Sequence, residues 1–105
     1  MEIVITSKAK NDLYGFFFKS KGNTSNNVLK YIGEVVEYIE IIKQSPHIGK
    51  AIYTNKHGVF RQLIYRKHKI LYIIINNKII ILRIVHSARK FNLKRNLNLK
   101  NFPDV

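Results

Sequence analysis

The sequence contains no cysteine, no tryptophan and only six acidic residues. The absence of cysteine excludes disulfide bonds, thiolate nucleophiles and cysteine-ligated metal sites. No apolar run reaches the roughly 20 residues that a membrane-spanning helix needs, because the two most apolar segments, 70–75 and 79–85, are separated by Asn76, Asn77 and Lys78. The N-terminus shows no basic n-region, apolar h-region or cleavage site, so we expect no secretion signal and a cytoplasmic protein.

Positive charge is what the chain does contain. It has 19 Lys and Arg against 6 Asp and Glu, which gives a formal net charge of +13. Between residues 41 and 103 there are fourteen Lys or Arg and no acid at all. A field of this sign favours a polyanionic partner: nucleic acid, an anionic membrane or an acidic protein segment. Of these three, we do not expect the membrane to be the partner.

A chain of 105 residues is expected to form a single domain, 1–105. Residues 2–6 are rich in β-branched side chains and favour a strand. Ser7 is a candidate N-cap for a helix that runs to about residue 20, and Thr24 or Ser25 opens a longer helix to about residue 44. The apolar residues of the longer helix recur at i, i+3/i+4 and i+7, which predicts an amphipathic helix.

From Ala51 onward the pattern changes to strands. The short segment 51–54 is followed by the apolar runs 59–65, 70–75 and 79–85, and Asn76-Asn77 predicts a tight turn between the last two. The expected order is β-α-α-β-β-β, with residues 92–105 as a basic tail or a short helix. Two N-terminal helices packed on one face of a small, mostly antiparallel sheet make an α+β fold.

Five short motifs follow one another with short gaps over most of the chain. They are SKAKNDL at 7–13, SPHIGK at 45–50, GVFRQL at 58–63, HKILYII at 68–74 and LRIVHSARK at 82–90. In type and order they resemble the helix entry, the P-x-x-G loop, the G-x-x-R strand, the aliphatic strand with a central Tyr and the RV-x-H-x-x-R ending of the RelE/ParE superfamily. Members of that superfamily are toxins of bacterial type II toxin–antitoxin pairs.

The resemblance implies two different activities. ParE-like members, which this chain resembles in the Gly58…Arg61 strand and the HSAR ending, act on DNA gyrase by binding. RelE-like members cut messenger RNA at the ribosome, and they usually carry a Tyr just beyond the last strand, where this chain has Phe91. A phenyl ring transfers no proton, so Phe91 favours the ParE-like reading. In either case the resemblance implies a cognate antitoxin with an acidic tail, and no cofactor.

Cleavage of RNA needs a general acid, a general base and cations for the phosphate. The candidate catalytic residues, for the endonuclease alternative only, are His86, Arg89, Lys69 and Arg83. If Ile75 pairs with Lys78, residue numbers across the hairpin sum to about 153. Residues 67–69 then lie beside 84–86 and form a cationic cluster at one end of the sheet. The same reasoning places Arg61 near Ile74, away from the cluster.

The remaining candidates are surfaces for a partner. They are Arg61, Arg66, Lys67, Lys90, Phe17 and Phe18. Each has a simpler interpretation: a charged turn is usually solvated, and Arg61 and Arg83 can pair with acids or with strand-end carbonyls. Tyr72 is expected in the core. The four histidines lack metal-ligand spacing, so we expect no metal. A third hypothesis, outside the family, is a non-toxic basic module that binds nucleic acid.

Overall fold

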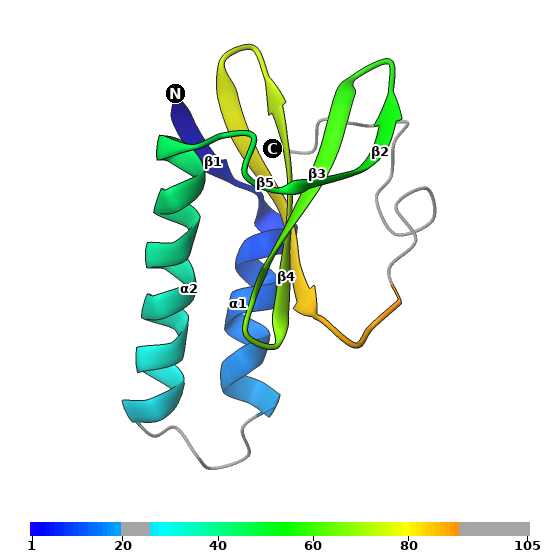
Figure 1. Ribbon diagram of the computed structural model, residues 1–105. Helices are drawn as coiled ribbons and strands as arrows, with labels where there is room; N and C mark the ends of the chain where they lie inside the picture. Colours follow the sequence, from blue (N-terminus) through cyan, green and yellow to red (C-terminus); the bar gives the residue numbers. More distant parts are fainter. Residues whose placement is uncertain (20–25, 91–105) are drawn as a thin grey trace.

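The computed structural model describes the backbone of residues 1–19 and 26–90, and the side chains of residues 1–15 and 28–90. The elements are β1 (Glu2–Ile5), α1 (Ser7–Lys19), α2 (Asn26–Gln44), β2 (Lys50–Asn55), β3 (Gly58–Tyr65), β4 (His68–Ile75) and β5 (Lys78–His86). Two helices and a mostly antiparallel sheet confirm the predicted α+β class (Figure 1). Four strands follow the helices, at the four segments predicted from Ala51 onward, so the order β-α-α-β-β-β counted one strand too few.

The five strands form one sheet in the order β1-β5-β4-β3-β2. Strand β1 runs parallel to β5, and the other three pairs are antiparallel. The predicted turn between β4 and β5 is confirmed, since Asn76 and Asn77 have φ of 51° and 61°. Asparagine tolerates this left-handed region better than most residues, and two such residues in succession make the turn whose twist suits a hairpin.

The hairpin of β4 and β5 contains a bulge that the sequence reading missed. From Ile75↔Lys78 to Tyr72↔Ile81 the paired numbers sum to 153, as predicted, but the register shifts between Leu71 and Tyr72. Beyond the shift His68 lies opposite His86, whereas the prediction placed it opposite Val85. A bulge inserts one residue into one strand, and this one therefore moves every later side chain of β5 by one position against β4.

Helix α1 is capped by Thr6, and not by Ser7 as predicted. The Thr6 hydroxyl accepts a hydrogen bond from the backbone N–H of Ala9 (3.2 Å), and the Thr6 carbonyl accepts one from Lys10 N–H (2.9 Å). The same hydroxyl donates to the carbonyl of Leu82 in β5 (3.1 Å). Thr6 thus both starts the helix and fixes its origin against β5. The predicted caps of α2, Thr24 and Ser25, lie outside the described residues.

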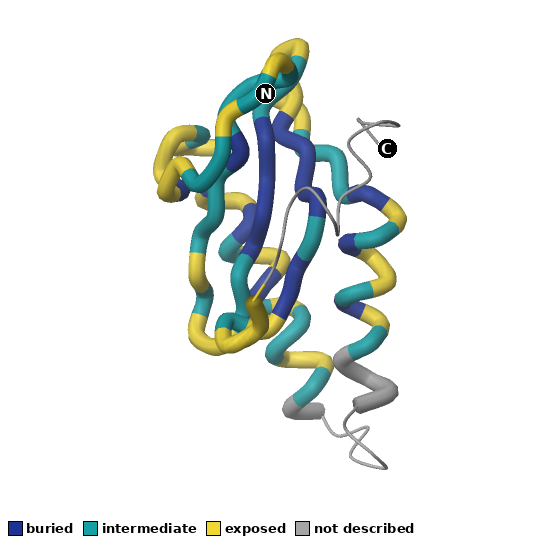
Figure 2. The backbone as a smooth tube through the Cα atoms, turned by 90° about the vertical axis from the view of Figure 1, so that its right-hand side faces the viewer, coloured by how far each residue is buried: buried dark blue, intermediate teal, exposed yellow. Residues whose placement is uncertain are grey.

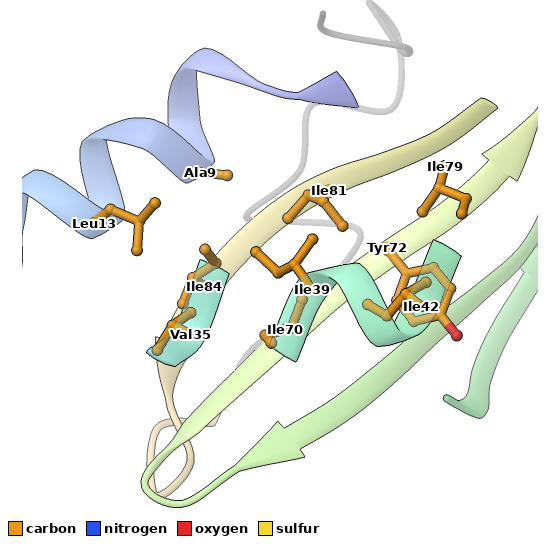
Figure 3. Close-up of a cluster of buried hydrophobic side chains, with 10 residues drawn as sticks. All are labelled: Ala9, Leu13, Val35, Ile39, Ile42, Ile70, Tyr72, Ile79, Ile81 and Ile84. Carbon is orange, nitrogen blue, oxygen red and sulfur yellow. The ribbon is translucent and has the colours of Figure 1, made fainter. Parts of the chain in front are cut away.

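The main core lies between the helices and one face of the sheet (Figure 3). It consists of Ala9, Leu13, Val35, Ile39, Ile42, Ile70, Tyr72, Ile79, Ile81 and Ile84. A second cluster lies on the opposite face and consists of Phe60, Leu71, Ile73, Ile80 and Leu82. Burial is therefore greatest along β4 and β5, while the hairpin turns are exposed (Figure 2). This explains why the sequences of β4 and β5 are apolar at successive positions and do not alternate.

The loop between α2 and β2 is held by Tyr72, whose side chain is fully buried as predicted. The Tyr72 hydroxyl donates to the carbonyl of Pro46 and accepts from Gly49 N–H, each at 2.8 Å. A Cβ on Gly49 would lie 2.7 Å from the Tyr72 ring, so the loop needs glycine at this position. Within the described residues, no helix is long and apolar enough to cross a membrane.

Candidate functional site

The ends of two hairpin strands and the segment after β5 meet at one end of the sheet. His68 and His86 are directly paired across β4 and β5, and their rings lie 5.7 Å apart in an edge-on arrangement. The backbone N–H of Ser87 donates to the carbonyl of Lys67 (2.7 Å), and the Lys69 ammonium donates to the carbonyl of Arg89 (3.0 Å). The turn at 66–67 and the segment at 86–89 are therefore adjacent.

A tight turn follows β5 and fixes the proton position on His86. Arg89 N–H donates to the His86 carbonyl (3.0 Å), and Ala88 N–H donates to His86 Nδ1 (3.1 Å). Because Nδ1 accepts a hydrogen bond here, the neutral ring carries its proton on Nε2. The His86 side chain is exposed, so this N–H is available to an acceptor on a partner.

His68 connects the site to helix α2. Its Nδ1 lies 2.6 Å from the hydroxyl of Tyr31, and the two rings are 5.3 Å apart. Burial raises the pKa of the Tyr31 hydroxyl above its ordinary value of 10.0, so this hydroxyl stays protonated at physiological pH. Nearby, Tyr65 donates to Glu34 (2.8 Å), and Arg66 lies 3.7 Å from the same carboxylate. The α2 helix thus holds the turn at 66–67 from one side.

Arg83 forms an ion pair with Asp12 of α1. The Arg83 Nε and a terminal nitrogen donate to the two carboxylate oxygens at 2.8 and 3.0 Å, and the backbone N–H of Ile84 donates to the same carboxylate at 2.8 Å. The two side chains are only 14% and 16% exposed. Arg83 therefore fixes α1 against β5, which agrees with its simpler interpretation as a residue that pairs with an acid.

A pocket of about 240 Å³ opens between α1 and the end of β5. It is lined by Asn11, Asp12, Gly15, Ile84, Val85, His86 and Arg89. The α1 side of the pocket was not recognised from the sequence. One signal was present, because Asp12 lies in the motif SKAKNDL and is one of only six acids in a very basic chain.

The candidate residues do not all meet at one point. His86 and Arg89 both line the pocket. Side chains alternate between the two faces of β4, and Ile70 and Tyr72 point into the helix-side core. Lys69 and Leu71 therefore point away from the helices, on the opposite face of the sheet. Leu71 pairs with Arg83, so Lys69 and Arg83 leave the sheet from the same face, and their joint contact with one phosphate stays a prediction.

The other candidates are spread over the surface. Arg61 pairs with Tyr72, two residues from the predicted Ile74, and its guanidinium donates to the carbonyls of Gly49 (2.9 Å) and His47 (3.4 Å). It lies away from the cluster, as expected. Arg66, Lys67 and Lys90 are exposed. The side chains of Phe17 and Phe18, and all of Phe91 and 92–105, lie outside the described residues. In the described part of the chain, no three potential ligands gather as a metal site.

Comparison with known proteins yields a matching family and several similar solved structures, one of which is described below. A family model described as the ParE toxin of the type II toxin–antitoxin system parDE matches residues 3–91. A solved chain titled "Chromosomal ParDE TA system from P. aeruginosa" is similar with a TM-score of 0.68 and 21% sequence identity, over 82% of this chain and 95% of that chain. At this identity the likeness concerns the fold alone. No curated protein sequence gives a match.

Proposed function

This chain belongs to the family of ParE toxins of type II toxin–antitoxin systems, and we propose from that premise that it inhibits growth by binding DNA gyrase in the cytoplasm. We propose further that a cognate antitoxin neutralises it through an acidic segment. The net charge of +13 and the absence of acids between residues 41 and 103 support a partner of that charge.

Binding is favoured over RNA cleavage by the separation of the four candidate catalytic side chains. The Nε and one terminal nitrogen of Arg83 donate to Asp12, and Lys69 leaves from the face of the sheet opposite the helix-side core. Stabilisation of a pentacoordinate phosphate needs donors aimed at one point from preorganised positions. His86 and Arg89 alone remain at the pocket, which suits recognition of an anionic group on a partner better than acid–base catalysis.

Two parallel measurements test this proposal. Purified toxin is added to purified gyrase with relaxed plasmid, and in a second reaction to translating ribosomes with a defined messenger RNA. We expect supercoiling to fall with toxin concentration and the messenger RNA to stay intact. Transcripts cut at codons, with supercoiling unaffected, would refute the gyrase proposal and favour the endonuclease alternative. In that case His86→Ala should lower the cleavage rate by about 10² or more, the usual value of a general acid or base.

Matched charge reversals test whether the basic end of the sheet contacts gyrase. Lys67 lies in the turn between β3 and β4, and Lys56 lies in the turn between β2 and β3 at the opposite end of β3; both are exposed. Lys67→Glu and Lys56→Glu change the net charge equally. We expect the first to weaken gyrase inhibition about tenfold and the second to change it little, because local and not total charge sets complementarity. Equal loss in both variants would show that only total charge matters.

A further inference from the structure

The pocket between α1 and β5 is concave and has a partly apolar lining. Its floor includes Ile84 and Val85 of β5, and its α1 wall includes Gly15. A Cβ added at Gly15 would meet no atom within 4 Å, so packing within the described chain does not explain the glycine. Glycine within a helix costs roughly 0.5–1 kcal/mol relative to alanine. The helix nevertheless leaves this space open toward the end of β5.

The pocket is smaller than most small-molecule sites and has room for one side chain. Sites for small molecules usually enclose about 300–1,000 Å³, whereas this pocket holds about 240 Å³. Pockets that accept a single anchoring side chain are common at the centres of protein interfaces. The pocket is therefore expected to receive part of a polypeptide.

The charges around the pocket select an acidic side chain. Among the described residues that line it, Asp12 is the single acid, and its carboxylate already accepts three hydrogen bonds from Arg83 and Ile84. At the rim stand His86, which carries its proton on the exposed Nε2 when neutral, and the guanidinium-bearing Arg89. Both groups donate hydrogen bonds, and arginine binds carboxylates through its planar fork.

We propose that this pocket binds one glutamate of an acidic peptide segment, with its methylene groups on Ile84 and Gly15 and its carboxylate on His86 and Arg89. The inference rests on the part of the proposed function that gives the toxin an acidic antitoxin, and it names where one residue of that partner binds. It does not depend on the target of the toxin. A chain that failed to inhibit gyrase would still be expected to bind the peptide, so the two failures are distinguishable.

The test uses the full chain and a short end-blocked peptide that alternates glutamate with serine, beside a control peptide with glutamine in place of every glutamate. Binding is followed by backbone amide chemical shifts at near-physiological salt. We expect the glutamate peptide to shift the amides of residues 84–89, and Gly15→Leu to weaken its binding about tenfold. The matched control Gly33→Leu, on an exposed part of α2 with equally open space, should leave the affinity within about twofold.

Each alternative outcome contradicts the proposal. Equal affinity for the two peptides, or unchanged affinity in Gly15→Leu, would show that the peptide binds by general charge and not in the pocket. A single-stranded oligonucleotide is tested in the same way. If it shifts the amides of residues 84–89, and Gly15→Leu weakens its binding but not that of the peptide, the pocket is assigned to nucleic acid. Arg89→Gln is the second variant if Gly15→Leu does not fold. It removes the charge-assisted hydrogen bond and should also weaken peptide binding about tenfold.

Discussion

Removal of the Asp12 carboxylate should destabilise the fold more than any other single change of a charged side chain described above. Asp12→Ala removes the carboxylate to which two nitrogens of Arg83 donate, although Arg83 is only 14% exposed, and takes the acceptor from Ile84 N–H. Breaking a buried ion pair from one side costs about 3–5 kcal/mol, because the remaining charge stays desolvated. A domain of this size is stable by roughly 5–15 kcal/mol. The variant should therefore lose a large part of its free energy of unfolding.

Urea unfolding of a double-mutant cycle measures this effect. The cycle comprises Asp12→Ala, Arg83→Met, which keeps most of the apolar stem, and the double variant. We expect the double variant to be more stable than the sum of the single losses implies, by a coupling free energy of about 0.5–3 kcal/mol. The matched control is Glu2→Ala, because Glu2 lies 3.8 Å from Lys78 with both side chains more than half exposed. That exposed pair should contribute no more than about 1 kcal/mol.

Two results would refute the reasoning. A loss of less than about 1 kcal/mol in Asp12→Ala would place this pair with ordinary surface pairs. Strict additivity in the cycle would show that Asp12 and Arg83 do not stabilise one another. The Arg83→Met variant also tests function. If the role of Arg83 is only structural, the toxicity of this variant should fall only in proportion to the fraction of folded protein. A fully folded but inactive Arg83→Met variant would instead give Arg83 a direct role.

Two further predictions concern the loop held by Tyr72. Gly49→Ala should lower the free energy of unfolding by about 1–3 kcal/mol, because the new Cβ would lie 2.7 Å from the Tyr72 ring. The control Gly33→Ala on α2 should not destabilise the protein. Equal stability of the two variants in thermal unfolding would contradict this prediction. Burial raises the pKa of Tyr72 above 10.0, so the folded state keeps a proton that the unfolded chain releases, and stability should fall as pH rises above about 10. Tyr72→Phe should be less stable at pH 7 but should lose less stability between pH 9 and 12, because among the described tyrosines with a raised pKa Tyr31 and Tyr65 then remain. An unchanged pH dependence would contradict the assignment.

The sequence predicted the parts of the fold that depend on local pattern. The helices, the α+β class and the turn at Asn76-Asn77 follow from periodicity and from residues with known turn geometry. The bulge between Leu71 and Tyr72 does not, because the inserted residue on β5 is as apolar as its neighbours and leaves no mark on the pattern. That single shift moved His68 opposite His86.

The candidate site was recognised from the sequence only where a local pattern marks it. His86 and Arg89 were identified from a motif, since their positions at the end of an apolar run can be read directly. The pairing of Asp12 with Arg83 joins residues 71 positions apart. The local sequence pattern around either residue does not indicate that the two are in contact. The choice of Thr6 over Ser7 as the cap depended on which hydroxyl also reaches Leu82, which is again a tertiary contact.

The parallel pairing of β1 with β5 has a consequence for synthesis in the cell. Residues 2–5 hydrogen-bond only with residues 78–81 in the sheet, and the pocket takes one wall from α1 and its floor from β5. Contacts of β1 and α1 with β5 become possible only after residues 78–86 have been synthesised, because these segments are far apart in the sequence. A nascent chain that stops before residue 86 therefore has neither the pocket nor the His68–His86 pair. The proposed antitoxin-binding pocket therefore forms only after β5 has been synthesised.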